Sequence, residues 1–383
     1  MHHPIARYVA NHIVICVHDF SRGGSERIAI GLARHWVEAG RKVTFLCGTT
    51  EGGLRDAVDP RVAVVALDPP IRRSLISRFW LGRAMAAKLP AMDADVVFLP
   101  GNFHFILAQA LKRVAPQIPV VAKVSNPLLP KLPRFIAGIV SRLLAISVRP
   151  IDTLVYMTPE LAGQGKQHLP GFRSAIVAEP NLPRGFVPSV RKQPDGVPLI
   201  IIAGRMERQK NLALALRAFA KLLRDRPAQL LVLGEGSERP KLEALVRKLG
   251  ISTQVSMPGY LPDVHEQLAG ASALLMTSLF EGYPAIVVEA LAADVPVVTT
   301  DCTPSLHQLI VSDLHGMIVK TATPGALAQG LGKALDLPFF SGGVRQATVA
   351  RSDATVSGDG YLDVFDRTIS EQYLSAGRGK ASA

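Results

Sequence analysis

Short runs rich in Val, Ile and Leu alternate with helical patterns along the chain, and this alternation limits the fold more than any other feature. In the first half the runs are residues 12–18, 43–47, 62–67, 96–99 and 120–123. Between them, apolar residues recur at helical spacing over residues 26–38 and 105–114. Strands that are almost continuously apolar have both faces buried, as in a parallel sheet covered by helices on each side. The pattern in the first half of the chain therefore predicts a doubly wound α/β domain.

A proline-rich stretch at residues 179–198 divides the chain, and the same alternation restarts after it. The second half has apolar runs at residues 199–203, 229–233, 254–257, 273–276 and 295–299, with helical patterns over residues 212–223, 241–249, 264–268 and 286–291. We expect an α/β fold of two Rossmann-like doubly wound domains that face each other across a cleft. The expected domains are residues 1–180, a linker at 181–198, residues 199–355, and a C-terminal helix and tail at 356–383 that packs back towards the first domain.

Composition points to a cytoplasmic protein. Hydrophobic residues make up 48% of the 383 residues, but no apolar run approaches the roughly 20 residues of a membrane-spanning helix. The first residues have neither the basic start nor the apolar run of a signal peptide. Cys16, Cys47 and Cys302 lack the spacing of metal ligands, so we expect buried free thiols in a reducing compartment.

The net charge of +12 is concentrated in the first half, where residues 70–150 hold twelve Lys and Arg against two acids. Such a basic segment favours an anionic partner, although an ordinary solvated surface would also account for it. If residues 128–149 are helical, a basic stripe lies beside a large apolar face, as in helices that lie on membranes. A core helix with one solvated edge remains the alternative. We expect this segment and residues 71–88 to bind an anionic membrane surface.

The segment from Glu281 to Glu289 carries the strongest functional signal. Two carboxylates flank a turn that holds a Gly and a Pro. If residues 282–284 form the turn and Ala285 begins a helix, Glu289 lies about one turn into that helix. The free amides at the start of the helix favour an anion, and the carboxylates suit hydroxyl groups. A sugar–phosphate–ribose ligand would fit, whereas the alternative is an exposed loop Glu followed by a solvated helical Glu.

Other expected strand ends carry similar turns. Gly23, Gly24 and Ser25 follow the first strand and open a helix, although helix capping alone could explain Ser25. Arg205 and Lys210 follow the first strand of the second half and could neutralise a diphosphate, or merely belong to a polar loop. Further turns hold Glu235, Tyr260 and Leu261. Because parallel sheets bind ligands at the carboxyl ends of their strands, these turns favour a nucleotide-type ligand.

The combination resembles glycosyltransferase family 4, whose members are retaining, nucleotide-sugar-dependent enzymes of the GT-B fold. Glu281 and Glu289 match the E-x7-E motif of that family, Arg205 and Lys210 match its basic pair, and residues 23–26 match its Gly-Gly loop. The resemblance implies transfer of a sugar from a UDP- or GDP-linked donor to a glycan or polyprenyl-diphosphate-linked acceptor. It also implies bacterial cell-surface polysaccharide or glycolipid synthesis by a protein peripheral on the inner face of the cytoplasmic membrane.

The resemblance also assigns roles. Glu281 would hold hydroxyls of the donor sugar, Glu289 would hold ribose hydroxyls, and Arg205 and Lys210 would neutralise the departing diphosphate. The amides of the turn would face phosphate or sugar, and a further turn would contact the base. These donor-binding residues are Gly23, Gly24, Ser25, Glu235, Tyr260, Leu261, Gly282, Tyr283, Pro284 and Ala285.

One part of the pattern is missing, because Ser125 stands where many members of the family have a His near the reaction centre. His104 is a possible substitute, so the expected catalytic set is Glu281, Arg205, Lys210 and His104. No metal or other cofactor is expected, since the sequence lacks an Asp-x-Asp spacing.

Other classes of protein fit the sequence less well. A nicotinamide-dependent oxidoreductase would carry GxGxxG after a strand, which residues 20–26 do not. Nucleic-acid binding lacks a motif here, and aromatic residues are only 6%. A nucleotide-sugar epimerase or a non-catalytic relative of the same fold remains the alternative.

Overall fold

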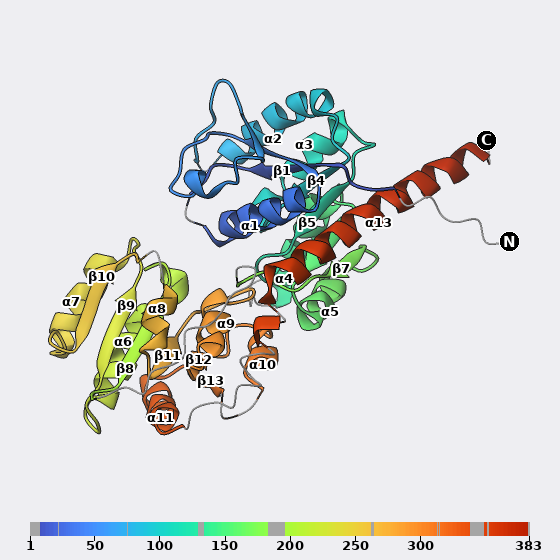
Figure 1. Cartoon of the computed structure of the whole chain (residues 1–383). Helices are drawn as coiled ribbons and strands as arrows, with labels where there is room; N and C mark the ends of the chain where they lie inside the picture. Colours follow the sequence, from blue (N-terminus) through green and yellow to red (C-terminus); the bar gives the residue numbers. More distant parts are fainter. Residues whose placement is uncertain are drawn as a thin grey trace. The chain divides into compact units, whose positions relative to one another are not determined.

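The structure is a computed structural model. It describes residues 8–21, 23–74, 76–128, 134–182, 196–261, 264–311, 313, 315–337, 348–350 and 352–381. The chain divides into two compact units (Figure 1). The first comprises residues 1–183 and 354–383, and the second comprises residues 184–353. Most of the expected linker at residues 181–198 lies outside the described residues.

The first unit contains a seven-stranded sheet in the order β3-β2-β1-β4-β5-β6-β7, with every pair parallel. Its strands are β1 (His12–Val17), β2 (Lys42–Cys47), β3 (Ala63–Ala66), β4 (Val96–Leu99), β5 (Val120–Lys123), β6 (Thr153–Tyr156) and β7 (Ser174–Ile176). Its α-helices are α1 (Gly24–Glu38), α2 (Ser77–Lys88), α3 (Leu107–Val114), α4 (Arg134–Val148), α5 (Pro159–His168) and α13 (Ala354–Ala381). Helix α1 packs against α13, and α2 packs against α3 (Figure 1).

The second unit contains a six-stranded parallel sheet in the order β10-β9-β8-β11-β12-β13. Its strands are β8 (Leu199–Ala203), β9 (Gln229–Leu233), β10 (Val255–Gly259), β11 (Ala273–Met276), β12 (Val297–Thr300) and β13 (Gly316–Val319). Its α-helices are α6 (Leu212–Leu222), α7 (Arg239–Leu249), α8 (Val264–Ala269), α9 (Ala285–Ala292), α10 (Leu306–Leu309) and α11 (Pro324–Leu335). Both sheets begin with the 3-2-1-4-5-6 order of Rossmann domains, which confirms the two doubly wound domains expected from the sequence.

Aromatic residues from distant parts of the chain form the centre of the first unit. The ring of Trp36, on α1, meets that of Phe98, on β4, at a centroid distance of 5.5 Å. Tyr361 and Phe365 of α13 pack against both, with centroids between 5.1 and 6.1 Å. All four side chains are fully buried. The C-terminal helix therefore completes the hydrophobic core that the first strands begin.

Several elements of the structure were not expected from the sequence. The patterns did not indicate β6, α5 or β7 in the first unit, nor β13 and α11 in the second. The missed strands have three or four residues and begin with Thr, Ser or Gly, so their apolar runs are too short to stand out. Together they extend each sheet by strands at one edge.

Candidate functional site

The second sheet reverses its direction of winding between β8 and β11. From β8 the chain continues to β9 on one side, and from β11 it continues to β12 on the other. In open parallel sheets, ligands bind beyond the carboxyl ends of the strands at such a switch point. Two segments with predicted site residues lie there. Residues 204–210 follow β8, and residues 277–284 follow β11.

Lys210 and Glu281 meet at this switch point. The Nζ atom of Lys210 lies 2.5 Å from Oε1 of Glu281, although 71 residues separate them in sequence. Ser278 donates a second hydrogen bond to the same oxygen at 2.6 Å. The aliphatic stem of Lys210 passes over Gly204, whose position would place a Cβ atom 3.4 Å from Cε of the lysine. The structure therefore brings together two residues that were predicted separately.

Hydroxyl groups at the end of β12 fix the turn after Glu281. Thr303 and Ser305 both donate to the carbonyl oxygen of Gly282, at 2.8 and 2.9 Å. Thr300 donates to the carbonyl oxygen of Ser278 at 2.8 Å. No motif in the sequence singled out these residues, although Ser and Thr at the ends of two apolar strands were a visible signal. They hold the carboxylate of Glu281 in place through the backbone on either side of it.

Both carboxylates of the E-x7-E segment are buried. The segment folds as expected, since Pro284 is the N-cap and α9 begins at Ala285. Glu281 is 8% exposed and Glu289 is 4% exposed, so the alternative of two solvated glutamates is wrong. No side chain of a described residue caps the start of α9, and the first amide groups of this helix therefore remain available to an anion.

The remaining predicted residues of this unit lie at neighbouring strand ends. Arg205 is exposed in the turn after β8 and forms no ion pair with a described residue. Glu235 pairs with Arg239 of α7 in an exposed salt bridge. Tyr260 is 51% exposed and Leu261 is partly buried, both directly after β10. These four residues lie beyond the carboxyl ends of three neighbouring strands, β8, β9 and β10.

Glycines bring two of these turns into close contact. A Cβ atom at Gly234 would lie 2.0 Å from the carbonyl oxygen of Gly204, and the φ angle of Gly234 is +130°. A Cβ atom at Gly236 would lie 2.4 Å from the carbonyl oxygen of Met206. Only glycine therefore permits the backbone after β9 to pack against the backbone after β8.

In the first unit, the predicted glycine turn also lies at a switch point, between β1 and β4. Gly23 is the N-cap of α1, and Gly24 has open space around its Cβ position. A Cβ atom at Gly101, after β4, would lie 2.7 Å from the hydroxyl of Ser25 and 3.0 Å from that of Ser125. The structure therefore brings the hydroxyls of Ser25 and Ser125 together beside Gly101.

The two candidates for the reaction centre of this unit differ in environment. The backbone amide of Ser125 donates to Oδ1 of Asn102 at 2.8 Å, and its side chain is partly exposed. His104 is buried, and desolvation together with the charge of Arg73 lowers its pKa to about 3. Its imidazole is therefore neutral at physiological pH. A catalytic role for either residue remains a prediction.

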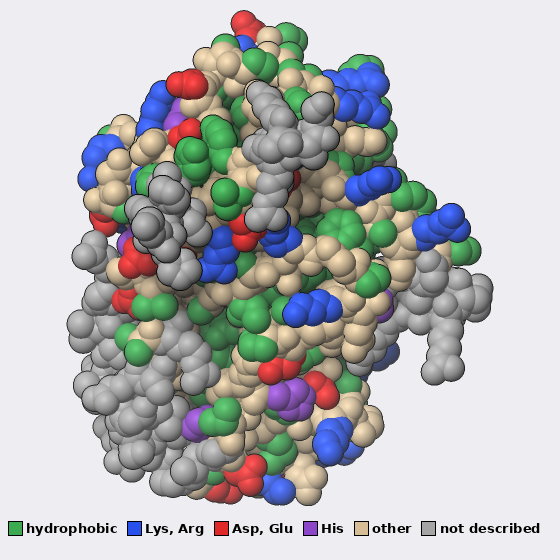
Figure 2. Space-filling view, turned by 90° about the vertical axis from the view of Figure 1, so that its right-hand side faces the viewer, with side chains coloured by type: hydrophobic (Ala, Val, Ile, Leu, Met, Phe, Trp, Pro, Cys, Tyr) green, Lys and Arg blue, Asp and Glu red, His purple; other side chains and the backbone are tan. Residues whose placement is uncertain are grey.

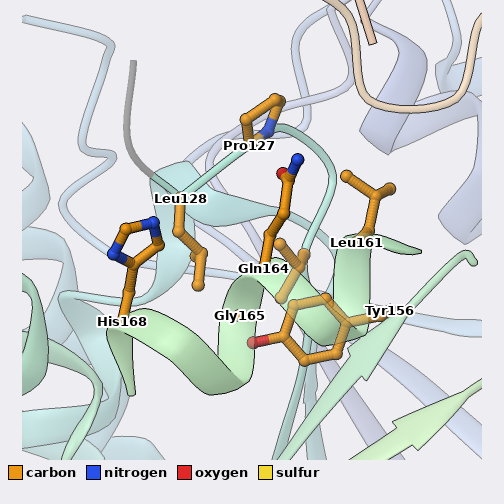
Figure 3. Close-up of a pocket in the computed structure, with 8 residues that line it drawn as sticks. Pro127, Leu128, Tyr156, Leu161, Gln164, Gly165 and His168 are labelled. Atoms are coloured by element: carbon orange, nitrogen blue, oxygen red, sulfur yellow. The ribbon is translucent and has the colours of Figure 1, made fainter. Parts of the chain in front are cut away.

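A small, mostly apolar pocket opens beyond β5 and β6, where the sequence predicted none. Figure 3 shows it between the loop that precedes α4 and the helix α5. The ring of Tyr156 forms one wall, and its hydroxyl lies where a Cβ atom of Gly165 would be. The other lining residues are Val124, Pro127, Leu128, Leu161, Gln164 and His168.

The described residues contain neither a group of metal ligands nor a membrane-spanning helix. Among them no three His, Cys, Asp or Glu side chains are grouped so that they could hold a metal ion. None of the helices, as far as they are described, combines the length and the apolarity needed to cross a membrane.

Solved structures place the fold in a known class. The lipopolysaccharide outer core galactosyltransferase WaaB, in its apo form, is 18% identical with a TM-score of 0.69, over 93% of this chain and 99% of that one. Anabaena Alr3699/HepE in complex with UDP-glucose is 14% identical with a TM-score of 0.67, over 95% and 99%. The chain therefore has the GT-B fold of glycosyltransferases.

Sequence comparison gives the family. The model of Glycosyltransferase Family 4 matches residues 22–177, and the model of Glycosyl transferases group 1 matches residues 186–349. The chain belongs to the family 4 glycosyltransferases, as the sequence motifs predicted.

Individual relatives are matched over shorter stretches. A Campylobacter jejuni N-acetylgalactosamine-N,N'-diacetylbacillosaminyl-diphospho-undecaprenol 4-alpha-N-acetylgalactosaminyltransferase is 32% identical over 34% of this chain and 36% of that relative. Two further relatives are matched over 29% and 19% of their lengths. The matched stretch thus spans about a third or less of these curated relatives.

Proposed function

We propose that this protein is a retaining glycosyltransferase that moves a sugar from a nucleoside-diphosphate sugar to a glycan or lipid-linked acceptor. The observation that carries the proposal is the contact between Lys210 and Glu281 at the switch point of the second sheet, beside the start of α9. A cation and free helix amides suit a diphosphate, and a buried carboxylate suits sugar hydroxyls.

The chemistry follows from this distribution of charge. In a retaining transfer, the donor diphosphate leaves as the anomeric carbon becomes cationic, and negative charge develops on the leaving oxygen. Lys210, the exposed Arg205 and the amides at the start of α9 would stabilise that charge. Glu281 would orient the sugar through its hydroxyl groups. The departing diphosphate would accept the proton of the acceptor hydroxyl, so no protein base is assigned.

The names of similar proteins support the same class of substrates. Anabaena Alr3699/HepE has been solved with UDP-glucose, and the Campylobacter relative is named for an undecaprenyl-diphosphate-linked acceptor. For this chain we propose a UDP- or GDP-linked donor and an acceptor of cell-surface polysaccharide or glycolipid synthesis.

We propose that the first unit binds the inner face of an anionic membrane, where such an acceptor would be found. On α4, Ile139, Leu143 and Ile146 form a stripe at helical spacing and are 60–65% exposed. Arg142 and Arg149 are exposed beside them. Apolar side chains with flanking cations are typical of helices that lie in the membrane interface.

Helix α2 has a second surface of this kind. Ile76, Phe79 and Trp80 are 58–63% exposed at its start. The guanidinium of Arg78 stacks on the ring of exposed Phe103, 5.1 Å from its centroid. On the face drawn in Figure 2, Lys and Arg side chains are likewise spread among apolar ones and do not merge into a continuous basic patch. This mixture favours a lipid surface over nucleic acid.

Two measurements test the donor assignment. Thermal unfolding in UDP, GDP and ADP should reveal one diphosphate that stabilises the protein, by about 2.7 kcal/mol at a ligand concentration 100 times Kd. Lys210→Met should abolish the shift. Lys241→Met is the matched control, because Lys241 forms an equally short but exposed pair with Glu238. Stabilisation by no nucleoside diphosphate would end the proposal.

Turnover distinguishes the enzyme from its alternatives. A panel of UDP- and GDP-sugars with a lipid-linked acceptor should yield a transferred sugar with retained anomeric configuration. Release of a free epimer without acceptor would identify an epimerase instead.

Vesicle flotation tests the membrane assignment. The protein should float with phosphatidylglycerol vesicles and remain behind with phosphatidylcholine vesicles. Leu143→Asp should weaken flotation, and Val311→Asp, at an exposed position of the second unit, should not. Equal binding to both kinds of vesicle would contradict the role of charge.

A further inference from the structure

Arg73 joins two buried carboxylates beside the start of α1. Its Nε atom lies 2.5 Å from Oδ2 of Asp19, which follows β1. One of its terminal nitrogens lies 2.6 Å from Oε1 of Glu26, in the first turn of α1. Asp19 and Glu26 are each 6% exposed, whereas half of the Arg73 side chain is accessible. These three residues are called the Arg73 cluster below.

The cluster adjoins the glycine turn that opens α1. A Cβ atom at Gly23 would lie 2.1 Å from Oε2 of Glu26, so the carboxylate occupies the space that a side chain at this position would need. The backbone of Gly23 is extended, with φ at −98°, which any residue can adopt. Glycine is needed at this position because a side chain would collide with the carboxylate of Glu26. The charge of Glu26 therefore lies against the backbone of the turn.

A well-fixed loop presents Arg73 to the two acids. The amide of Ile71 donates to the carbonyl oxygen of Gly48 at 2.9 Å. Ser74 and Ser77 exchange hydrogen bonds between backbone and side chain at the start of α2. Arg73 therefore reaches the first turn of α1 from a segment anchored on both sides, 47 residues further along the chain.

The cluster creates an electrostatic requirement. The free amides at the start of a helix attract anions, whereas two nearby carboxylates repel them. We propose that Arg73 is a positioning residue that offsets the charges of Asp19 and Glu26 and so keeps the turn at Gly23 and Gly24 receptive to a phosphate group. This inference rests on the proposed function and adds a requirement to it.

Titration of the cluster should reveal this role. Burial alone would raise the pKa of Asp19, but hydrogen bonds from Arg73 and Ser21 more than offset it and lower the pKa below its ordinary value. Asp19 therefore stays ionised from pH 6 to 9 in the wild type. Further ionisable groups coupled to the cluster are His18, Cys47 and His104, which feel the charge of Asp19 or Arg73. Burial lowers the pKa of both histidines, and His104, with a pKa of about 3, remains neutral over this range.

The first experiment is Arg73→Met, measured as kcat/KM relative to the wild type from pH 6 to 9. Without the guanidinium, burial and mutual repulsion raise the pKa values of the two acids. We expect a loss of about 10- to 100-fold at pH 9, where both are charged. The loss should shrink as the pH falls and the acids take up protons. Arg173→Met is the matched control, because Arg173 lies in the same unit, is about as exposed as Arg73, pairs with Glu371 outside the cluster and should leave activity unchanged.

Removal of the acids should rescue the variant. Arg73→Met combined with Asp19→Asn and Glu26→Gln should recover to within a few-fold of the wild type and lose the pH dependence. A merely structural role for Arg73 would give a loss that is equal at every pH and is not rescued by the neutral amides. A loss that is equal at every pH, or a failure of the neutral amides to restore activity, would overturn the proposal.

Separate binding measurements identify the phosphate. Weaker binding of UDP or GDP to Arg73→Met, without acceptor, assigns the effect to the donor. An unchanged donor affinity with a raised KM for a diphosphate-linked acceptor assigns it to the acceptor. Either of these two results supports a phosphate at the turn. If Arg73→Met changes neither the donor affinity nor the KM for the acceptor, the proposed phosphate site is contradicted.

Two safeguards keep the test decisive. If Arg73→Met does not fold, Asp19→Asn with Glu26→Gln in the wild-type background should bind the same phosphate more tightly, and an unchanged or weaker affinity would overturn the proposal. Wild-type turnover is measured first, so that a failure of the proposed function is recognised before any variant is compared.

Discussion

Replacement of Glu281 with Gln should separate the attraction of the site for diphosphate from its attraction for sugar. In the structure, the carboxylate of Glu281 lies 2.5 Å from Nζ of Lys210 and so takes part of the charge that the proposed diphosphate needs. Gln keeps the size and one hydrogen-bonding oxygen but removes the negative charge. The nucleoside diphosphate alone should therefore bind more tightly to Glu281→Gln.

The geometry sets the size of this gain. A phosphate oxygen in contact with Nζ, at about 2.8 Å on the far side, would lie about 5 Å from the carboxylate. Repulsion between unit charges at that distance is about 1 kcal/mol in water and about 3 kcal/mol at an effective dielectric constant of about 20. Because the side chain of Lys210 is 21% exposed and the side chain of Glu281 only 10% exposed, a value between these limits applies. We expect affinity for UDP or GDP to rise about tenfold.

The nucleotide sugar should respond differently. It would gain the same relief from repulsion but lose charge-assisted hydrogen bonds to its hydroxyls, each of about 1.5–3 kcal/mol. The preference for the nucleotide sugar over the bare diphosphate should therefore fall. Titration calorimetry with both ligands at low ionic strength measures this ratio, and Glu238→Gln, in the exposed pair with Lys241, is the control. Unchanged or weaker binding of the bare diphosphate to Glu281→Gln would refute the reasoning.

Three further predictions concern stability and reactivity. Lys123→Met should destabilise the protein by about 3–5 kcal/mol in denaturant titrations, because it leaves the buried carboxylate of Glu179 without its cation, and addition of Glu179→Gln should recover part of the loss. Gly234→Ala should lower Tm and nucleotide affinity together, since its Cβ would collide with backbone, whereas Gly332→Ala, in open space on α11, should stabilise by up to about 1 kcal/mol. All three thiols should react slowly with Ellman's reagent in native protein at pH 8 and completely in denaturant, because burial raises each pKa to about 11 or 12. Rapid native labelling would contradict the last prediction.

The regular parts of the fold could be predicted from the sequence because they depend on local pattern. The bounds of β8, β9 and β11 agree with the apolar runs, and α9 begins at Ala285 as expected. Each of these elements consists of a few consecutive residues, and their apolar composition indicates that both faces are buried. Short edge strands such as β7 carry too few residues for the same signal.

The contacts within the site could not be predicted in this way. The sequence marked Lys210 and Glu281, but their contact depends on β8 and β11 being neighbours, which is a property of strand order. Whether Glu289 was buried or solvated also stayed open until the packing of α9 was known. The ion pair between Arg73 and Glu26 joins two segments that share no sequence motif, so no spacing in the sequence could predict it.

The return of α13 has a consequence for engineering. Since Tyr361 and Phe365 complete the core around Trp36, the first unit is encoded by two separate stretches of the gene. A chimera with a single crossover near residue 183 would pack a foreign C-terminal helix against Trp36 of the native first unit. Exchange of this unit between homologues therefore needs a second crossover near residue 354, so that α13 and the residues it packs against come from the same parent protein.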